Sequence, residues 1–183
     1  DGIMVTTINS NLTSAIDLTF AVRLDENSRI SFIGTQKNGD FDIDEMLAKR
    51  MISSENVSGV SNRDVVKPWA NGKDLTGRPR NRWVIDFGVY LSLEEAIQYE
   101  VPFKYLEDNV KGFRLTNHRK AYRGWWWIHA EPRPALRNAL ILLKRYIATS
   151  IVAKHRFFVW LGTDVIPDKR LTVIARDDDY FLD

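Results

Sequence analysis

Short apolar stretches bounded by turn residues recur along the chain, a pattern typical of β-strands. The clearest stretch is 82–87, Arg-Trp-Val-Ile-Asp-Phe. Another, 30–35, precedes Lys37-Asn38-Gly39-Asp40, where Asn-Gly favours a tight turn because both residues tolerate positive φ. Further strands are predicted at 15–22, 146–152, 156–161 and 170–176.

A first helix is predicted after Asp42, because Glu45 follows at the spacing of a capping box. In a capping box, the side chains of the two residues accept hydrogen bonds from each other's backbone N–H groups. The apolar residues expected along one face of this helix are Ile43, Met46, Leu47 and Met51.

Three more helices are predicted further along the chain. Ser92 and Glu95 form a second capping box, and the apolar stripe of the helix they start is Leu93, Ala96 and Ile97. Pro102 is expected to end that helix, and another is expected around 103–110. Pro134 suits the first position of a helix, and apolar residues follow it at helical spacing, namely Leu136, Ala139, Leu140 and Leu143.

The segments between these elements are polar. Residues 53–62 are interpreted as a loop, 63–81 as a turn-rich segment that includes Lys67-Pro68, and 164–168 as a turn. Strands and helices alternate without the rhythm of βαβ units. The sequence therefore predicts an α+β fold, with a small mixed or antiparallel sheet and several short helices in a single domain.

The composition allows a folded domain that needs no covalent or metal support. The chain has 183 residues, of which 44% are hydrophobic, and it has no cysteine, which excludes disulfides and thiolate chemistry. No apolar run approaches the roughly 18 residues of a membrane span, and no signal peptide is visible. We therefore expect a cytoplasmic protein with no membrane partner.

The charge is distributed unevenly, although the net charge is only +2. Residues 111–156 contain eleven Lys or Arg, all three histidines and one acidic residue, Glu131, so the stretch carries a net charge of +10. Such a local excess of positive charge favours a polyanionic partner, above all nucleic acid.

The motifs of several enzyme classes are missing. None of the six prolines is followed by another, so the Asn-Pro-Pro-Tyr loop of an adenine methyltransferase is absent. There is no phosphate-binding P-loop, His-x-Glu zinc motif or Gly-x-Ser-x-Gly elbow. Pro167-Asp168-Lys169 matches half of a nuclease signature, and Asp177-Asp178-Asp179 is an acidic run of a kind that is usually solvated. We expect no catalytic residue and no metal ligand; a divalent-metal nuclease and a basic protein-interaction module remain as alternatives.

A set of weak motifs in a specific order resembles a known family. The chain from Phe32 onward is similar to the target-recognition region of MmeI-like type IIG restriction–modification enzymes and related adenine-specific DNA methyltransferases. The matching residues are Phe32-Ile33-Gly34, Asp64–Pro68, Asn71–Leu75, Arg82–Phe87, Glu94-Glu95-Ala96, Arg119, Trp126-Trp127, Arg133-Pro134, Tyr146-Ile147, Ala153–Phe157, Pro167-Asp168 and Ile174–Arg176.

The resemblance implies that this chain recognises double-stranded DNA for a larger prokaryotic enzyme. Residues 1–25 would form the junction with an upstream methyltransferase domain, and residues 26–183 would form the target-recognition domain, truncated at its C-terminus. S-adenosylmethionine would be the cofactor of the parent chain and not of this fragment. The parent would be a site-specific adenine methyltransferase, in some family members fused to an endonuclease.

The resemblance places base-reading residues in the segment that contains Lys154, His155 and Arg156. Arginine can contact guanine O6 and N7 through two hydrogen bonds, and lysine does so with looser geometry. If the segment is a strand, residues 154 and 156 share one face and His155 lies on the other. Contact with phosphates, or exposure to solvent alone, is the alternative for these three residues.

Two further groups of cations are candidates for contacts with DNA phosphates. Arg78, Arg80 and Arg82 surround a turn-rich loop, for which a salt bridge to a nearby acid is the alternative. Arg119, Lys120 and Arg123 belong to the basic stretch.

Other residues with distinctive chemistry have interpretations that involve no catalysis. At least one residue of Trp125-Trp126-Trp127 is expected in the core, with stacking on a base as the alternative. Asp86 is expected to be a structural hydrogen-bond acceptor. His118 and His129 lack the spacing of metal ligands and are expected on the basic face.

Overall fold

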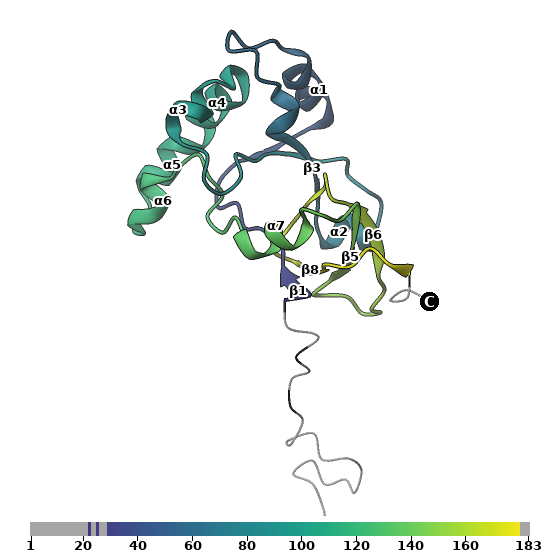
Figure 1. The fold of residues 1–183 in the computed structure, drawn as a ribbon. Helices are drawn as coiled ribbons and strands as arrows, with labels where there is room; N and C mark the ends of the chain where they lie inside the picture. The colour runs from purple at the N-terminus through teal and green to yellow at the C-terminus, as the bar shows by residue number, and fades with distance from the viewer. Residues whose placement is uncertain (1–21, 23–24, 26–28, 180–183) are drawn as a thin grey trace, which may run out of the picture.

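The computed structural model describes residues 22, 25 and 29–179. The strand expected at 15–22 falls, except for Val22, outside these residues, as do the last four residues of the chain. Within this part of the chain no helix is long and apolar enough to cross a membrane. Two small sheets and several short helices confirm the expected α+β class (Figure 1).

The first sheet is antiparallel throughout. Its strands, in spatial order, are β1(Ser31–Ile33), β8(Leu171–Ile174), β5(Arg145–Ser150) and β6(Val159–Gly162). Strand β8 lies in the middle, and Val173 pairs with Phe32 on one side and with Ala148 on the other. The first strand of the described region, β1, therefore pairs with the last one, β8.

The second sheet is mixed. Its order is β2(Asp42–Ile43), β4(Trp83–Ile85), β3(Val66–Ala70) and β7(Ile166–Pro167), and only β3 and β7 run parallel. Lys67-Pro68 was expected in a turn, but both residues lie within β3. Pro68 faces Trp83 of β4 in the strand register. The 3-10 turn η3(Asn62–Asp64) leads into this strand.

The first helix begins two residues later than predicted. Asp44, not Asp42, is the N-cap of α1(Glu45–Ser53), and its side chain accepts a hydrogen bond from the Leu47 N–H. Asp42 lies in β2, because its backbone pairs with Val84, and its carboxylate forms an ion pair with Lys37. The buried residues of α1 are Ala48 and Met51, whereas Met46, which was expected on the buried face, is exposed.

The second capping box is confirmed. Ser92 and Glu95 cap α3(Leu93–Ile97) reciprocally, although Ile97 is half exposed. Pro102 does not end a helix, because it lies in the first turn of α4(Glu100–Leu106), where its missing N–H has no intrahelical partner to lose. The helical path continues through a π-helical segment, η4(Glu107–Lys111), and α5(Gly112–Leu115), and α6(Lys120–Gly124) follows.

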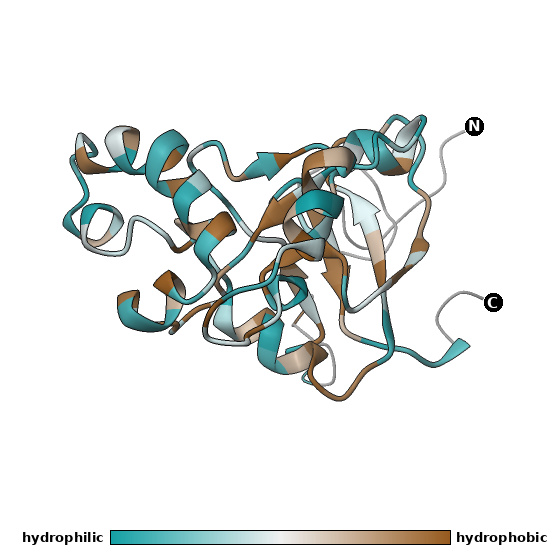
Figure 2. Cartoon of the chain, turned by 90° about the horizontal axis from the view of Figure 1, so that it is seen from above, coloured by the Kyte–Doolittle hydropathy of each residue, from teal (hydrophilic) through white to brown (hydrophobic). Residues whose placement is uncertain are grey.

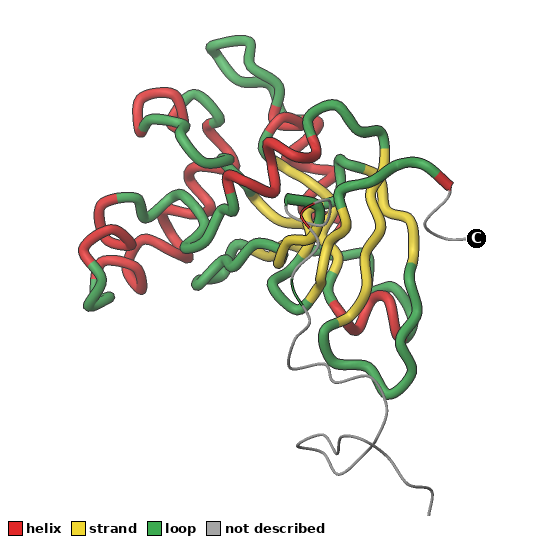
Figure 3. The backbone as a smooth tube through the Cα atoms, turned by 60° about the horizontal axis from the view of Figure 1, so that its bottom comes forward, coloured by secondary structure: helices red, strands yellow, loops and turns green. Residues whose placement is uncertain are grey.

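Helices α3 to α6 form a helical arm on one side of the molecule, away from the antiparallel sheet (Figure 1, Figure 3). Two shorter helices lie next to the sheets: α2(Gly72–Thr76), with an Asn71–Asp74 capping box, and α7(Pro134–Leu140), which begins at Pro134 as predicted. Polar and apolar residues alternate along the helices, whereas apolar residues dominate the central strands (Figure 2).

Two clusters of buried apolar residues form the core. The larger cluster connects the mixed sheet with α1 and the helical arm. The smaller cluster packs on the antiparallel sheet around Tyr146, Leu171 and Val173. Trp126 and Trp127 belong to the larger cluster, and the Trp127 indole N–H donates to the Leu91 carbonyl. The expectation that the tryptophan run contributes to the core is confirmed; Trp125 is half exposed.

Candidate nucleic-acid interface

The three predicted base-reading residues lie in a loop and not in a strand. Strand β5 ends at Ser150 and β6 begins at Val159, so residues 151–158 connect the two strands. Lys154, His155 and Arg156 are all exposed there. The alternation expected if this segment were a strand therefore does not apply, because residues 151–158 lie outside β5 and β6.

Hydrogen bonds from buried side chains hold the backbone at both ends of this loop. Thr149 Oγ1 donates to the Phe157 carbonyl over 2.8 Å, and Ser150 Oγ donates to the Val152 carbonyl over 3.0 Å. The Ile151 N–H donates to the Arg170 carbonyl over 2.9 Å. Both hydroxyl donors belong to buried residues, which limits the competition from water for these bonds. The loop thus presents exposed side chains on an anchored backbone.

Three segments that are distant in sequence meet at the base of this loop. A β-carbon added to Gly72, the first residue of α2, would lie 2.8 Å from Ser150 Oγ and 3.9 Å from the Arg170 carbonyl oxygen. A residue without a side chain is required at this approach. The contact places α2 beside β5, as Figure 1 shows, and puts the β7–β8 turn next to both.

This meeting point gathers positive charge. Six exposed cations lie on the three segments: Lys73 and Arg78 on and after α2, Lys154 and Arg156 in the loop, and Lys169 and Arg170 in the turn. None of the six has an ion-pair partner among the described residues. Of the nearby acids, Asp74 pairs with Arg80, and Asp168 accepts from the backbone N–H of Arg170. We call these six residues the basic edge.

Three members of the basic edge were not among the predicted contacts. Lys73, Lys169 and Arg170 lie outside the basic stretch 111–156, and the contact of Gly72 with Ser150 and Arg170 reveals their place. The glycine of Asn71-Gly72 indicates that another segment can approach closely at this point, but the sequence does not show which segment does so.

One of the three predicted phosphate-binding arginines after α2 is restrained by an ion pair. Arg80 forms two hydrogen bonds with Asp74, Nε to Oδ1 at 2.9 Å and Nη2 to Oδ2 at 3.2 Å. The hydrogen bond to Asp74 raises the pKa of Arg80, against the opposing effect of burial. Arg82 is half buried. The pKa of Lys37 is lowered to about 8 chiefly by burial, with a smaller contribution from the positive charge of Arg82. Arg78 alone is exposed and unpaired among the described residues of this group.

The other predicted phosphate group lies elsewhere. Lys120 and Arg123 belong to α6, and Arg119 is its N-cap, at the far end of the helical arm from β5 and β6 (Figure 1). The Arg123 guanidinium donates to the carbonyls of Asn117 and His118, and Arg119 donates to the Tyr122 hydroxyl. The structure therefore separates the predicted cations into two surfaces and does not bring them into one patch.

Several cations of the basic stretch are already buried or paired with acidic residues of this chain. Arg114 is buried, Arg137 pairs with Asp86, and Arg145 pairs with Asp179 while it stacks on Trp160 at 3.9 Å from the ring centroid. Lys111 and Arg133 pair with glutamates. The net charge of +10 counted along the sequence therefore overstates the charge available to a ligand.

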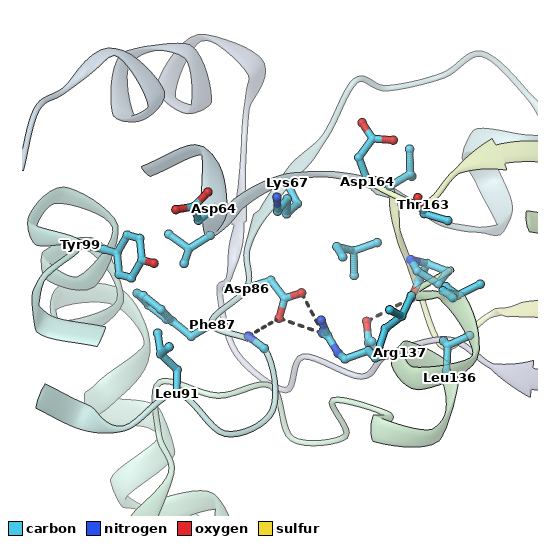
Figure 4. A pocket seen from close by; sticks show the side chains of 18 residues that line it. Asp64, Lys67, Asp86, Phe87, Leu91, Tyr99, Leu136, Arg137, Thr163 and Asp164 are labelled. Carbon is cyan, nitrogen blue, oxygen red and sulfur yellow. Dashed lines mark hydrogen bonds and ion pairs between the residues drawn. The ribbon is translucent and has the colours of Figure 1, made fainter. Parts of the chain in front are cut away.

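A cavity of about 450 Å³ lies between the helical arm, α7 and the turn that joins β6 to β7 (Figure 4). The Asp86–Arg137 ion pair forms part of its wall. Arg137 Nη2 lies 2.9 and 2.8 Å from the two carboxylate oxygens, and the Gly88 N–H donates to the same carboxylate. Burial alone would raise the pKa of Asp86, but Arg137 and His129 lower it below its usual value. Asp86 is thus a structural acceptor, as predicted, and ties β4 to α7.

His129 lies behind this pair and not on the basic face, which corrects the prediction. Its imidazole is fully buried, Nε2 is 3.0 Å from the Ile85 carbonyl, and Nδ1 has no hydrogen-bond partner. Burial lowers the pKa of His129 to about 4, although Asp86 Oδ1 lies only 3.8 Å from Nδ1. His118 is exposed as expected. The described residues contain no group of three or more side chains suited to bind a metal ion.

Comparison with known proteins identifies the fold. The chain is similar to part of MmeI, a type IIL restriction–modification enzyme whose structure was solved in complex with DNA, with a TM-score of 0.61 at 13% sequence identity. The similarity covers 98% of this chain and 24% of the MmeI chain, so the chain spans about a quarter of that enzyme's length. No protein-family model and no curated protein matches the chain. The expected resemblance to MmeI-like enzymes is confirmed at the level of the fold.

Proposed function

We propose that this chain is the DNA target-recognition domain of a larger S-adenosylmethionine-dependent adenine methyltransferase of a restriction–modification system. The observation that carries the proposal is the basic edge, where six exposed cations without ion-pair partners lie on an anchored loop and on the two segments that meet at its base. The fold similarity to a segment of an enzyme solved with DNA supports the same proposal. Chemistry on DNA would belong to the methyltransferase domain of the parent chain, which would form the opposite wall of the DNA cleft.

Phosphate contacts should make binding to duplex DNA weak and strongly dependent on salt. If four to six phosphates are neutralised, the logarithm of the binding constant should fall against log[salt] with a slope of about −4 to −5. Fluorescence anisotropy with a labelled random duplex measures this slope. A flat salt response would exclude the electrostatic interface.

The roles within the interface can be separated by substitution. Arg156→Ala should relax the preference at one base position and cost about 1–3 kcal/mol on the preferred site. Arg78→Ala should instead weaken binding evenly across sequences and flatten the salt slope by about one unit. Lys120→Ala reports whether the helical arm also contacts DNA. Arg63, exposed on η3, provides the control.

Sequence selection is the decisive measurement. Several rounds of selection from a random duplex library, with each variant, should return one motif for the wild-type chain and a degenerate position for Arg156→Ala. If Arg156→Ala lowers recovery but returns the same motif, Arg156 contacts phosphate or supports the loop. Magnesium-dependent cleavage of the library by the chain alone would favour the alternative function as a nuclease.

A further inference from the structure

The loop that joins β5 to β6 exposes large apolar side chains as well as cations. Val152 is 83% exposed, and Ile151 and Phe158 at the two ends of the loop are also exposed. Lys154 and Arg156 lie between them. An apolar side chain on a mobile loop would carry little information, but Val152 is held: Ser150 Oγ bonds its carbonyl, and the preceding N–H bonds Arg170.

We propose that Val152 recognises the 5-methyl group of a pyrimidine in the major groove of bound DNA, next to the base edges that Lys154 and Arg156 contact. The inference rests on the proposed function. The methyl group of thymine is the one apolar feature of the major-groove edge, and an apolar side chain is its natural partner. The cations without ion-pair partners on this loop and on the two segments that meet at its base favour DNA over a protein as the surface that covers Val152.

The backbone at Val152 is already held in the free chain. The backbone of Val152 is fixed by a buried hydroxyl donor, so little freedom is lost when its side chain meets a methyl group. Burial of one methyl group is worth a factor of about four in affinity. Such a factor suffices to produce a clear preference for thymine at one position of a selected motif.

The test compares two random duplex libraries, amplified with either dTTP or dUTP. The libraries have identical base pairing and differ only in the 5-methyl group. With the wild-type chain, one thymine position of the motif should become degenerate in the dUTP library, while the other positions persist. Val152→Ala should lose the same preference in the dTTP library and keep its salt slope. Leu142→Ala, which truncates a residue 92% exposed at the other end of β5, should keep the full motif.

A second set of duplexes distinguishes thymine from a methylated cytosine. Replacing the affected T·A pair by a 5-methylcytosine·G pair should give about four-fold tighter binding than unmethylated C·G, and this difference should vanish in Val152→Ala. Because Val152 is exposed, the variant should unfold at the wild-type urea concentration.

The possible failures are distinct. If the wild-type motif is the same in both libraries, or if Val152→Ala keeps its thymine, the methyl contact is refuted and the proposed function stands. If the wild-type chain selects no motif from either library, the proposed function fails and this inference fails with it. If duplex DNA leaves Val152 accessible while a protein partner protects it, the surface belongs to that partner and the methyl contact is wrong.

Discussion

The buried guanidinium of Arg114 offers a quantitative test of how the fold is held together. The residue is 1% exposed, and it has no ion-pair partner among the described residues. Its five hydrogen bonds all go to backbone carbonyls, those of Lys37, Asn38, Tyr122, Trp125 and Ile128, over 3.0 to 3.3 Å. Burial lowers the pKa of Arg114, but arginine stays charged in proteins. One side chain thus connects the turn after β1 with the helical arm.

Arg114→Met removes every donor and leaves these carbonyls in the interior. Each carbonyl that finds no new donor costs about 1–3 kcal/mol, so two such groups cost about 2–6 kcal/mol. Arg114→Lys should also destabilise the chain, because an ammonium has three donors and cannot reproduce the planar fork of a guanidinium. With total stabilities of about 5–15 kcal/mol, either change removes a large part of the free energy of unfolding.

Urea denaturation followed by tryptophan fluorescence measures the effect. With an m-value of about 2 kcal/mol/M, a loss of about 4 kcal/mol lowers the midpoint by about 2 M. Arg63→Met is the matched control, because Arg63 is exposed and its side chain makes no hydrogen bond within the described part of the chain. If Arg114→Met unfolds within about 0.5 M of the control, the carbonyl cluster does not depend on the guanidinium and our reasoning is wrong.

Three further changes test other parts of the structure. The pKa of His129 falls from 6.5 to about 4 on folding, so the contribution of the neutral imidazole to stability is complete above pH 6.5, and about 3 kcal/mol is lost by pH 4. In His129→Gln the urea midpoint should therefore depend less on pH between 6.5 and 4.5. If the midpoint of the variant falls with pH as steeply as that of the wild type, the assignment is refuted. Gly34→Ala would place a β-carbon 2.2 Å from the Asp168 carbonyl oxygen and should destabilise the chain by at least about 2 kcal/mol. Gly112→Ala is the control, because no atom lies within 4 Å of the added β-carbon. Equal urea midpoints for the two variants would contradict this prediction. Asp74→Asn should release Arg80 and steepen the salt slope of DNA binding by up to about one unit, and a shallower slope would show that the pair itself shapes the interface.

The sequence predicted an element correctly where residues close together in the chain determine it. The capping box of Ser92 and Glu95, the proline at the start of α7 and the strand around Val84 all formed as predicted. Errors arose where a local signal had two solutions. Asp42 and Asp44 both suit a helix N-cap, and the pairing of Asp42 with Val84, 42 positions away, decided between them. Pro102 can end a helix or occupy a first turn, and only the preceding chain direction distinguishes the two.

The candidate site was harder to predict, because ion pairs and close approaches join distant segments. Arg137 and Asp86 are 51 positions apart, and Arg145 and Asp179 are 34 apart, so counting charge along the sequence could not show that these arginines are neutralised. The basic edge depends on the approach of Gly72 to Ser150 and Arg170, which the sequence indicates only as a glycine after an asparagine. The loop between β5 and β6 was predicted in the right region of the chain but too short, because the apolar residues that flank positions 153–155 were assigned to the strands.

The cations of this chain divide by what they already contact, and this division indicates which of them can bind DNA. The guanidinium of Arg114 is buried and that of Arg137 is paired with the buried Asp86, so a phosphate could recruit either of them only by breaking bonds that hold the fold. Arg80 would have to leave Asp74 first. The exposed cations of the basic edge have no such bond to break, and they lose only hydration and side-chain freedom when they meet a phosphate, a cost that the release of counterions offsets. Positive charge that is left without an acidic partner beside an anchored loop is therefore a stronger indication of a DNA interface than the number of basic residues in the sequence.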